Sequence, residues 1–232
     1  MVALITGAAK GIGKELVIGL SKKGIDIIFT YNNSLNEANK LVKYIKEHSN
    51  VNIYSFKCDL SKEEDIKNLK NKVLKKYENI DILINNAALS MDNYIDSKTK
   101  EEFMKVLEVN VVGTFLLTKY FYKNINNGII VNISSTDSID TYSPINIDYS
   151  VSKAGVNMLT KEFSSIFNNI KVIGVMPNWT NTESIKEMNP IFLEEELKRI
   201  GQERLEEPLD VSNNIINLIF DKNIKSGEIR RV

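Results

Sequence analysis

A tyrosine and a lysine four residues apart are the groups in this sequence most suited to acid–base chemistry. Tyr149 and Lys153 lie in a stretch with helical periodicity, which places both side chains on one face of a helix. A free phenol has a pKa of about 10, too high for efficient proton transfer at neutral pH. A fixed ammonium nearby favours the phenolate and lowers that pKa. The pair therefore suits a proton donor, although such a pair taken alone is more often structural.

A serine at the end of a predicted strand could work with this pair. Ser135 lies fourteen residues before Tyr149 and follows an apolar run. Its hydroxyl can hydrogen-bond a substrate oxygen and hold it for proton transfer. Ser134 and Thr136 carry hydroxyls at the neighbouring positions and remain alternatives.

A glycine-rich turn follows the first predicted strand and leads directly into a helix. Glycines allow the backbone to turn sharply and to approach a ligand closely, and the helix presents free N–H groups and a positive dipole end. In this strand–turn–helix context the turn predicts a pyrophosphate site. The residues of Thr6–Gly13 expected to bind a dinucleotide are Gly7, Ala9, Lys10, Gly11, Ile12 and Gly13.

Short apolar runs alternate with longer amphipathic ones along the whole chain. The runs predict strands at Val2–Thr6, Asp26–Thr30, Asn52–Lys57, Ile80–Asn85, Gly128–Ser134, Ile170–Met176 and Glu228–Arg230. The periodic segments predict helices at Ile12–Lys22, Leu35–Glu47, Lys62–Tyr77, Thr99–Tyr122, Tyr149–Phe167 and Pro208–Phe220. Strands that are apolar on both faces belong inside a parallel sheet. We therefore predict an α/β fold: one domain over residues 1–232, with a doubly wound, Rossmann-type parallel sheet of about seven strands and helices on both faces.

One segment interrupts this alternation. Residues 178–202 follow the carboxyl end of a predicted strand and carry Trp179, Met188 and Phe192, with a helical piece near Ile191–Ile200. Long excursions at that end of a strand usually bind or cover a ligand. We expect this segment to close over a substrate.

Composition excludes several classes of protein. Thirty basic residues balance thirty acidic ones, so neither nucleic acid nor an anionic membrane is an expected partner. The only histidine, His48, lies in a polar stretch typical of a helix end, which removes support for a Ser-His-Asp hydrolase or a zinc enzyme. The only cysteine, Cys58, allows no intrachain disulfide. With no apolar run long enough for a membrane span and no expected signal peptide, we expect a cytoplasmic protein.

Six motifs in the expected order resemble the short-chain dehydrogenase/reductase family over essentially the whole chain. The glycine spacing is Gly-x3-Gly-x-Gly, and Tyr149 and Lys153 match the family's Tyr-x3-Lys. The other matching elements are Asp59, Asn85-Asn86-Ala87-Ala88, Asn110 and Ile133-Ser134-Ser135. The rhythm around residues 30–34 and 85–88 looks closest to the 3-oxoacyl-acyl-carrier-protein reductase branch.

The resemblance implies an oxidoreductase that interconverts a carbonyl and an alcohol of a small-molecule substrate by hydride transfer. Tyr149 would be the general acid or base, and Asn110, Ser135 and Lys153 the other catalytic residues. Lys153 would also hold the nicotinamide ribose and tune Tyr149, and Asn110 would hold a water; for Asn110 a capped helix kink remains the alternative. Beyond the glycine turn, the implied cofactor-binding residues are Asn32, Asp59, Leu60, Asn86, Ala87, Ala88, Tyr149, Lys153, Pro177 and Thr182.

The sequence departs from the family pattern at two positions. Ala88 and Asn178 stand where glycine is usual, although asparagine tolerates a positive φ better than most residues. The segment between Ser135 and Tyr149 is also one residue longer than usual. The resemblance further implies a homodimer or a homotetramer, with pairing through the helices Thr99–Tyr122 and Tyr149–Phe167. A non-catalytic, nucleotide-sensing binding protein on the same fold is the alternative function.

The stretch Thr30-Tyr31-Asn32-Asn33-Ser34 favours NADP(H) over NAD(H). An NAD site usually has a carboxylate at the end of the second strand, where it binds ribose hydroxyls and would repel a 2′-phosphate. Here no acid precedes Glu37 after that strand. Hydroxyl and amide groups can donate hydrogen bonds to a phosphate, and Lys10 adds a positive charge.

Overall fold

The strands and helices of the computed structural model follow the alternation in the sequence. The structure describes residues 1–186 and 188–232, with backbone only at Ser184; residue 187, inside the segment expected to cover a substrate, lies outside the described residues. Its strands form a seven-stranded, all-parallel sheet in the order β3-β2-β1-β4-β5-β6-β7. They are β1 (Val2–Ile5), β2 (Asp26–Tyr31), β3 (Ile53–Lys57), β4 (Ile80–Asn85), β5 (Ile125–Ile133), β6 (Lys171–Met176) and β7 (Ile229–Arg231). The predicted fold class is confirmed.

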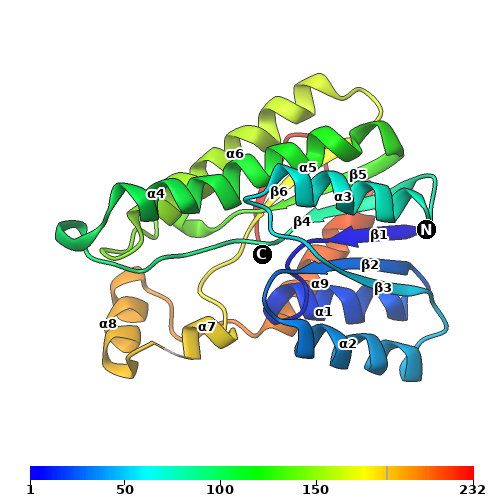
Figure 1. The fold of residues 1–232 in the computed structure, drawn as a ribbon. Coiled ribbons are helices and arrows are strands. Elements are labelled where there is room, and N and C mark those ends of the chain that lie inside the picture. The colour runs from blue at the N-terminus through cyan, green and yellow to red at the C-terminus, as the bar shows by residue number, and fades with distance from the viewer. Residues whose placement is uncertain (187) are drawn as a thin grey trace.

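Helices cover both faces of the sheet (Figure 1). One layer holds α1 (Gly11–Lys22), α2 (Leu35–His48) and α9 (Pro208–Phe220); the other holds α3 (Glu63–Leu74), α4 (Lys100–Leu107), α5 (Gly113–Phe121) and α6 (Ile147–Ile166). The shorter α7 (Glu183–Lys186) and α8 (Pro190–Ile200) lie at the end opposite the N-terminus, within the segment expected to cover a substrate (Figure 1).

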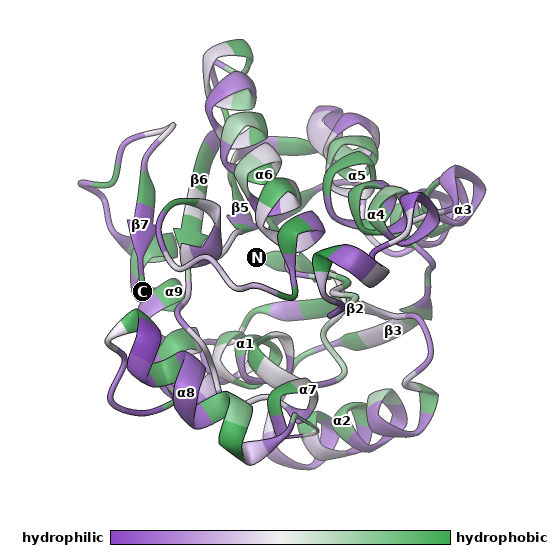
Figure 2. Cartoon of the chain, turned by 90° about the vertical axis from the view of Figure 1, so that its left-hand side faces the viewer, coloured by the Kyte–Doolittle hydropathy of each residue, from purple (hydrophilic) through white to green (hydrophobic). Residues whose placement is uncertain are grey.

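The two layers of helices bury opposite faces of the same strands. In β1, Ala3 and Ile5 pack toward α1 and α9, while Leu4 packs toward α3 and α5, and all three are fully buried. Successive side chains of a strand point to opposite faces, so a strand covered on both sides is apolar at every position. The inner strands β1, β4 and β6 are accordingly apolar at most positions. The edge strand β7 is largely hydrophilic, and α2, α3 and α8 mix hydrophilic and hydrophobic residues (Figure 2).

Several boundaries differ from the prediction, and three of the differences change the local structure. The helix expected over Thr99–Tyr122 contains a π-helical turn, Glu108–Val112, between α4 and α5. Helix α6 begins two residues before Tyr149, which places Tyr149 inside the first turn. Strand β5 begins at Ile125, three residues earlier than predicted, where it pairs with Ile80 of β4. The chain then passes through a left-handed residue, Asn127 with φ 52°, and pairing with β4 resumes at Ile129.

No helix in the described part of the chain is both long enough and apolar enough to cross a membrane. His48 lies at the exposed end of α2, stacked on Tyr44, as its polar surroundings predicted.

Candidate active site

The glycine turn between β1 and α1 leaves no room for side chains. Gly7 has φ +61°, and a Cβ there would lie 2.7 Å from the Cα of Ala87. A Cβ on Gly13 would lie 2.6 Å from Nδ2 of Asn86. The backbone therefore needs glycine both for its left-handed conformation and for the close approach of the loop after β4.

The loop after β4 is fixed to this turn by hydrogen bonds. The backbone N–H groups of Asn86 and Ala87 both donate to Oγ1 of Thr6, at 3.0 Å each. The side chain of Asn86 donates to the carbonyl of Thr6 at 2.9 Å and to that of Gly7 at 3.2 Å. Ala88, where the family usually has glycine, is exposed, so its methyl group meets no crowding within the protein.

Two residues expected to hold the cofactor come from the segment after β6. A Cβ on Gly11 would lie 3.2 Å from the methyl group of Thr182, so Thr182 lies beside the glycine turn. The carbonyl of Pro177 accepts a hydrogen bond from the backbone N–H of Thr136 at 3.1 Å, which ties the end of β6 to the residues after β5. Asn178 adopts no positive φ, because Asn127 is the only non-glycine residue with one among residues 1–186 and 188–232.

The other residues of the expected cofactor site follow β2 and β3. Asn32, just after β2, is exposed, and so is Lys10 in the glycine turn. Leu60 is buried under Gly113 of α5. Burial of Asp59 opposes its ionisation, but hydrogen bonds from Ser61, at 2.7 Å and 3.1 Å, and the charge of Lys62 bring its pKa below the ordinary value. Asp59 is therefore an anion at neutral pH, with its oxygens partly engaged by its own loop.

Helix α6 places Tyr149 and Lys153 on one face, as the spacing predicted. The Lys153 Nζ lies 5.3 Å from the centre of the Tyr149 ring and donates a hydrogen bond of 2.7 Å to the carbonyl of Ile133, at the end of β5. Lys153 is buried and Tyr149 is half-buried. Strand β5 thus holds the ammonium beneath the phenol.

Among the three candidate hydroxyls after β5, Ser135 is the one that hydrogen-bonds Tyr149. Its Oγ also accepts the backbone N–H of Asp137 at 3.1 Å. Ser134 points away and donates to the carbonyl of Lys153 at 3.0 Å. Thr136 is fully buried, and its Oγ1 lies 2.8 Å from Oγ1 of Thr141. The geometry therefore brings Ser135, and neither neighbour, to the phenol.

The protein's own groups move the two pKa values in ways the sequence did not predict. Burial raises the pKa of Tyr149, and the negative charges of Asp137 and Asp92 raise it further, against a lowering by the Ser135 hydrogen bond. Burial lowers the pKa of Lys153 to about 8, and the charge of Asp137 offsets only part of that. The ammonium of Lys153 together with the positive charge of an oxidised nicotinamide would lower the pKa of the phenol, whereas in the chain by itself the pKa of Tyr149 is raised.

Asn110 lies in the π-helical turn and is buried. Its Oδ1 accepts the backbone N–H of Leu89 at 2.7 Å, and its Nδ2 donates to the carbonyl of Leu89 and to Oγ of Ser152, both at 2.9 Å. Ser152 in turn donates to the carbonyl of Tyr149 at 2.7 Å. These bonds cross to other elements, unlike those of a residue that merely caps its own helix, and π-turns are frequent at functional sites.

Asp137 is a site residue that the sequence reasoning missed. It is 4% exposed, its Oδ1 accepts from Thr141 at 2.7 Å, and its Oδ2 accepts from Asn146 at 3.3 Å. Desolvation raises its pKa, while these hydrogen bonds oppose the rise. Its place two residues after Ser135, on the loop that leads to Tyr149, was the available signal.

A match to a family model shows which protein family has this site. Residues 1–191 match the model described as short chain dehydrogenase. The chain belongs to the short-chain dehydrogenase family. It is therefore an oxidoreductase that acts on CH–OH or C=O groups, and its family uses a nicotinamide cofactor. The glycine turn fits such a cofactor, because it leads from β1 directly to the first turn of α1, where the N-cap Lys10 makes no side-chain hydrogen bond and backbone N–H groups can meet a pyrophosphate.

Named relatives of this short-chain dehydrogenase act on different substrates. Glucose 1-dehydrogenase 2 of Bacillus subtilis is 28% identical over 218 residues, which cover 90% of this chain and 84% of the relative. The 3-oxoacyl-[acyl-carrier-protein] reductase FabG of Thermotoga maritima is 31% identical over 230 residues, 96% of this chain and 91% of the relative. These relatives support the predicted family and its FabG-like branch.

Solved structures share the fold of this short-chain dehydrogenase. A short-chain dehydrogenase from Burkholderia cenocepacia in complex with NADP superposes with a TM-score of 0.90 at 23% identity, covering 99% of this chain and 95% of that one. An alcohol dehydrogenase from Thermococcus sibiricus with 5-hydroxy-NADP gives 0.85 at 21%, covering 99% and 94%. Together with the family match, the convergence of Ser135, Tyr149 and Lys153 does not favour the alternative of a non-catalytic binding protein.

Proposed function

We propose that this chain is an NADP(H)-dependent enzyme that interconverts a ketone or aldehyde and an alcohol, with Tyr149 as the general acid and base. The observation that carries the proposal is the meeting of Ser135, Tyr149 and Lys153 where β5 ends and α6 begins. Ligands of doubly wound folds bind beyond the carboxyl ends of the strands, and the glycine turn lies at the same edge of the sheet.

Each of the three side chains has a distinct part in the reduction. The Ser135 hydroxyl donates a hydrogen bond to the substrate oxygen and holds it next to Tyr149. The Tyr149 hydroxyl gives its proton to that oxygen, and its raised pKa keeps the phenol protonated at neutral pH until it does. Lys153 approaches the ring from below and stabilises the phenolate left behind. When bound, the nicotinamide supplies or accepts the hydride. In oxidation of the alcohol the same proton moves in reverse.

A turnover assay with several substrate classes tests the proposal. The panel contains acetoacetyl-CoA, ethyl acetoacetate, cyclohexanone and D-glucose, each with NADP(H) and NAD(H), and cofactor absorbance at 340 nm is followed. We expect turnover of at least one carbonyl or alcohol. If no compound turns over while titration shows tight cofactor binding, the chain is a nucleotide-binding protein and the proposed activity is wrong.

The preference for NADP(H) is supported by a basic groove beside the glycine turn. The groove, of about 580 Å3, lies between α1 and α2 and is lined by Lys10, Lys14 and Lys40 together with Glu37 and Glu183. It lies beside the turn and away from Tyr149. No carboxylate occupies residues 31–34 at the end of β2. In the groove three lysines outnumber Glu37 and Glu183, which leaves an excess of positive charge for a 2′-phosphate.

We expect wild-type protein to bind NADPH at least about tenfold more tightly than NADH. A phosphate–lysine contact at a partly exposed site contributes about 1–3 kcal/mol, and about 1.4 kcal/mol is tenfold in affinity. Lys10→Ala should reduce the difference in affinity between the two cofactors, mostly by weakening the binding of NADPH. Calorimetric titration of both cofactors measures this, with Lys22→Ala at the far end of α1 as the control. Equal affinities for the two cofactors in the wild type would refute the preference.

We also propose that the chain self-associates through α4, α5 and α6. These helices and the π-helical turn between α4 and α5 carry exposed apolar side chains on one side of the sheet: Met104, Val112, Phe115, Val151, Met158 and Ile166. Exposed apolar area of this kind is uncommon on monomers, and two-fold pairing buries it twice over. Light scattering at micromolar concentration should give at least twice the mass of one chain, and Phe115→Glu with Met158→Glu should reduce it. A monomeric wild type would contradict the proposal.

A further inference from the structure

A buried ion pair joins the loop after β4 to the start of α6, and none of the roles above uses it. Lys98 Nζ lies 3.0 Å from Oδ2 of Asp148, and the two side chains are 4% and 0% exposed. Removing two charges from water carries a desolvation penalty that their attraction offsets only with good geometry and further hydrogen bonds. A buried pair is therefore weak evidence of stabilisation, and its location is more informative.

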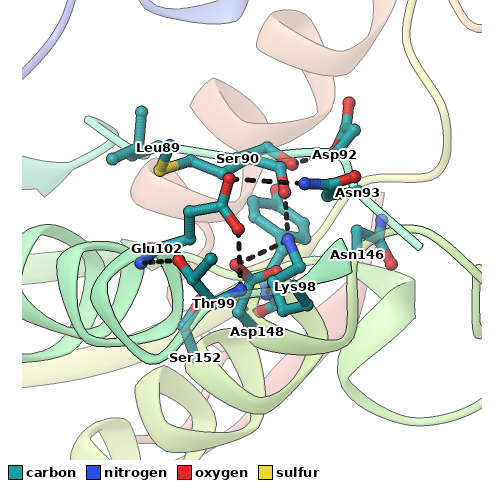
Figure 3. A network of polar contacts seen from close by, with 12 residues as sticks. Leu89, Ser90, Asp92, Asn93, Lys98, Thr99, Glu102, Asn146, Asp148 and Ser152 are labelled. Atoms are coloured by element: carbon teal, nitrogen blue, oxygen red, sulfur yellow. Dashed lines mark hydrogen bonds and ion pairs between the residues drawn. The ribbon is translucent and has the colours of Figure 1, made fainter. Parts of the chain in front are cut away.

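The remaining hydrogen bonds of the pair join it to the loop at one end and to Tyr149 at the other. Lys98 also donates to the carbonyl of Met91, in the same loop. The Oδ1 of Asp148 accepts the backbone N–H of Tyr149 at 2.9 Å. Figure 3 shows Lys98 reaching from the loop to Asp148 on the helix. An unbroken set of polar contacts thus runs from residues 89–98 to the backbone of the proposed general acid.

Two other contacts fix the same loop to the same region. The backbone N–H of Asn93 donates to the carbonyl of Ile145 at 2.7 Å, just before α6. At the other end of the loop, the side chain of Asn110 hydrogen-bonds both the N–H and the carbonyl of Leu89. The charge of Asp92 acts on Tyr149, so this loop forms part of the surroundings of the phenol. Lys98 and Asp148 supply the only one of these three links that is made by two opposite charges.

We propose that Lys98 and Asp148 are positioning residues for Tyr149. Together they hold the loop of residues 89–98 against the first turn of α6, so that the phenol is presented to Ser135 in one orientation. Because each charge neutralises the other, the pair adds rigidity without adding net charge beside the phenol. The inference rests on the catalytic role proposed for Tyr149.

The double variant Lys98→Met with Asp148→Asn tests the pair. It removes both charges at similar side-chain size, and the amide oxygen introduced by Asp148→Asn can still accept from the Tyr149 backbone. The variant therefore loses the link between loop and helix, together with the Lys98 hydrogen bond to the Met91 carbonyl within the loop. We expect kcat to fall about 10- to 100-fold, since misplacing a reacting group by about 1 Å has effects of that size. The NADPH Kd should stay unchanged, and the isotope effect with 4-deuterated NADPH should rise as proton and hydride transfer become rate-limiting.

A matched control on the same helix is Thr160→Val. Thr160 is fully buried and accepts a hydrogen bond from Asn132 at 2.9 Å, far from Tyr149 along α6. This variant should lower the melting temperature and leave kcat and the isotope effect alone. If kcat of the double variant stays within twofold of wild type, or if Thr160→Val lowers kcat as much, the pair has no positioning role.

Hydrogen exchange provides a readout that needs no turnover. In the double variant, amides of residues 89–98 and 147–152 should exchange at least about tenfold faster, as expected when local opening becomes easier. In Thr160→Val the same amides should keep their wild-type rates. Unchanged exchange in the double variant overturns the inference. If the double variant exchanges faster but the wild type turns over no substrate, the link between the loop and α6 stands and only its catalytic role is refuted.

Discussion

Tyr149→Phe is expected to lower kcat by about 10²–10⁴-fold, the range that general acid–base catalysis contributes. Phenylalanine keeps the ring over Lys153 and removes only the hydroxyl that hydrogen-bonds Ser135. Fold and NADPH affinity should therefore change little, and the loss should appear in kcat and in kcat/KM alike. Steady-state kinetics combined with cofactor titration measures both.

Tyr142→Phe is the control for that experiment. Tyr142 is 63% exposed, and its hydroxyl donates to the carbonyl of Ile139 on the loop that leads to α6. Its loss should leave kcat within about twofold, because surface changes usually have small effects. A Tyr149→Phe enzyme that retained most of its kcat would remove the proposed mechanism.

Lys153→Met should abolish most activity and yet stabilise the cofactor-free protein at neutral pH. Burial lowers the pKa of Lys153 from 10.5 to about 8, so the unfolded chain binds more protons than the folded one between those values. Stability of the wild type therefore rises with pH across that window, and below pH 8 the desolvation penalty is present in full. Methionine at this position carries no charge and removes the desolvation penalty, so the free energy of unfolding should rise by on the order of 1–3 kcal/mol at pH 7.

Denaturant unfolding of the cofactor-free proteins from pH 6 to pH 10 measures this effect. The gain of Lys153→Met over wild type should be largest below pH 8 and shrink toward pH 10. Titration should show weakened binding of NADPH, since the ammonium is proposed to hold the nicotinamide ribose. Lys161→Met, at an exposed position of the same helix, should match wild type in both measurements. Unchanged stability, pH dependence and cofactor affinity in Lys153→Met would contradict the assigned role.

Most of the fold was predictable because its signals are local. Apolar runs and amphipathic periods predicted all seven strands, and Pro208–Phe220 matches its helix at both ends. The π-turn at Glu108–Val112 was not predictable, because Asn110 bonds there to Leu89 and Ser152, which are remote in sequence. The early start of β5 was hidden by Asn127 and Gly128, which are typical of a turn.

The candidate site shows the same division between local and tertiary signals. Helical spacing alone placed Lys153 under Tyr149, and the glycine turn was visible from three glycines. The direction of the Tyr149 pKa was wrong for the chain by itself, since burial and the charge of Asp137 depend on how separate loops pack. The pairing of Lys98 with Asp148, fifty residues away, leaves no trace in the sequence pattern.

The strand order also governs when this enzyme can assemble during synthesis. Strand β1 pairs with β2 on one side, but its other neighbour is β4, whose last residue, Asn85, follows Ile5 by eighty positions. At about 5–20 residues per second, a nascent chain waits roughly 4–16 seconds before that edge can be covered. During the wait Ala3, Leu4 and Ile5 expose unpaired backbone to other chains. The glycine turn is made first, the helix bearing Tyr149 is made only after β5, and the site is complete only when Pro177 and Thr182 have followed β6.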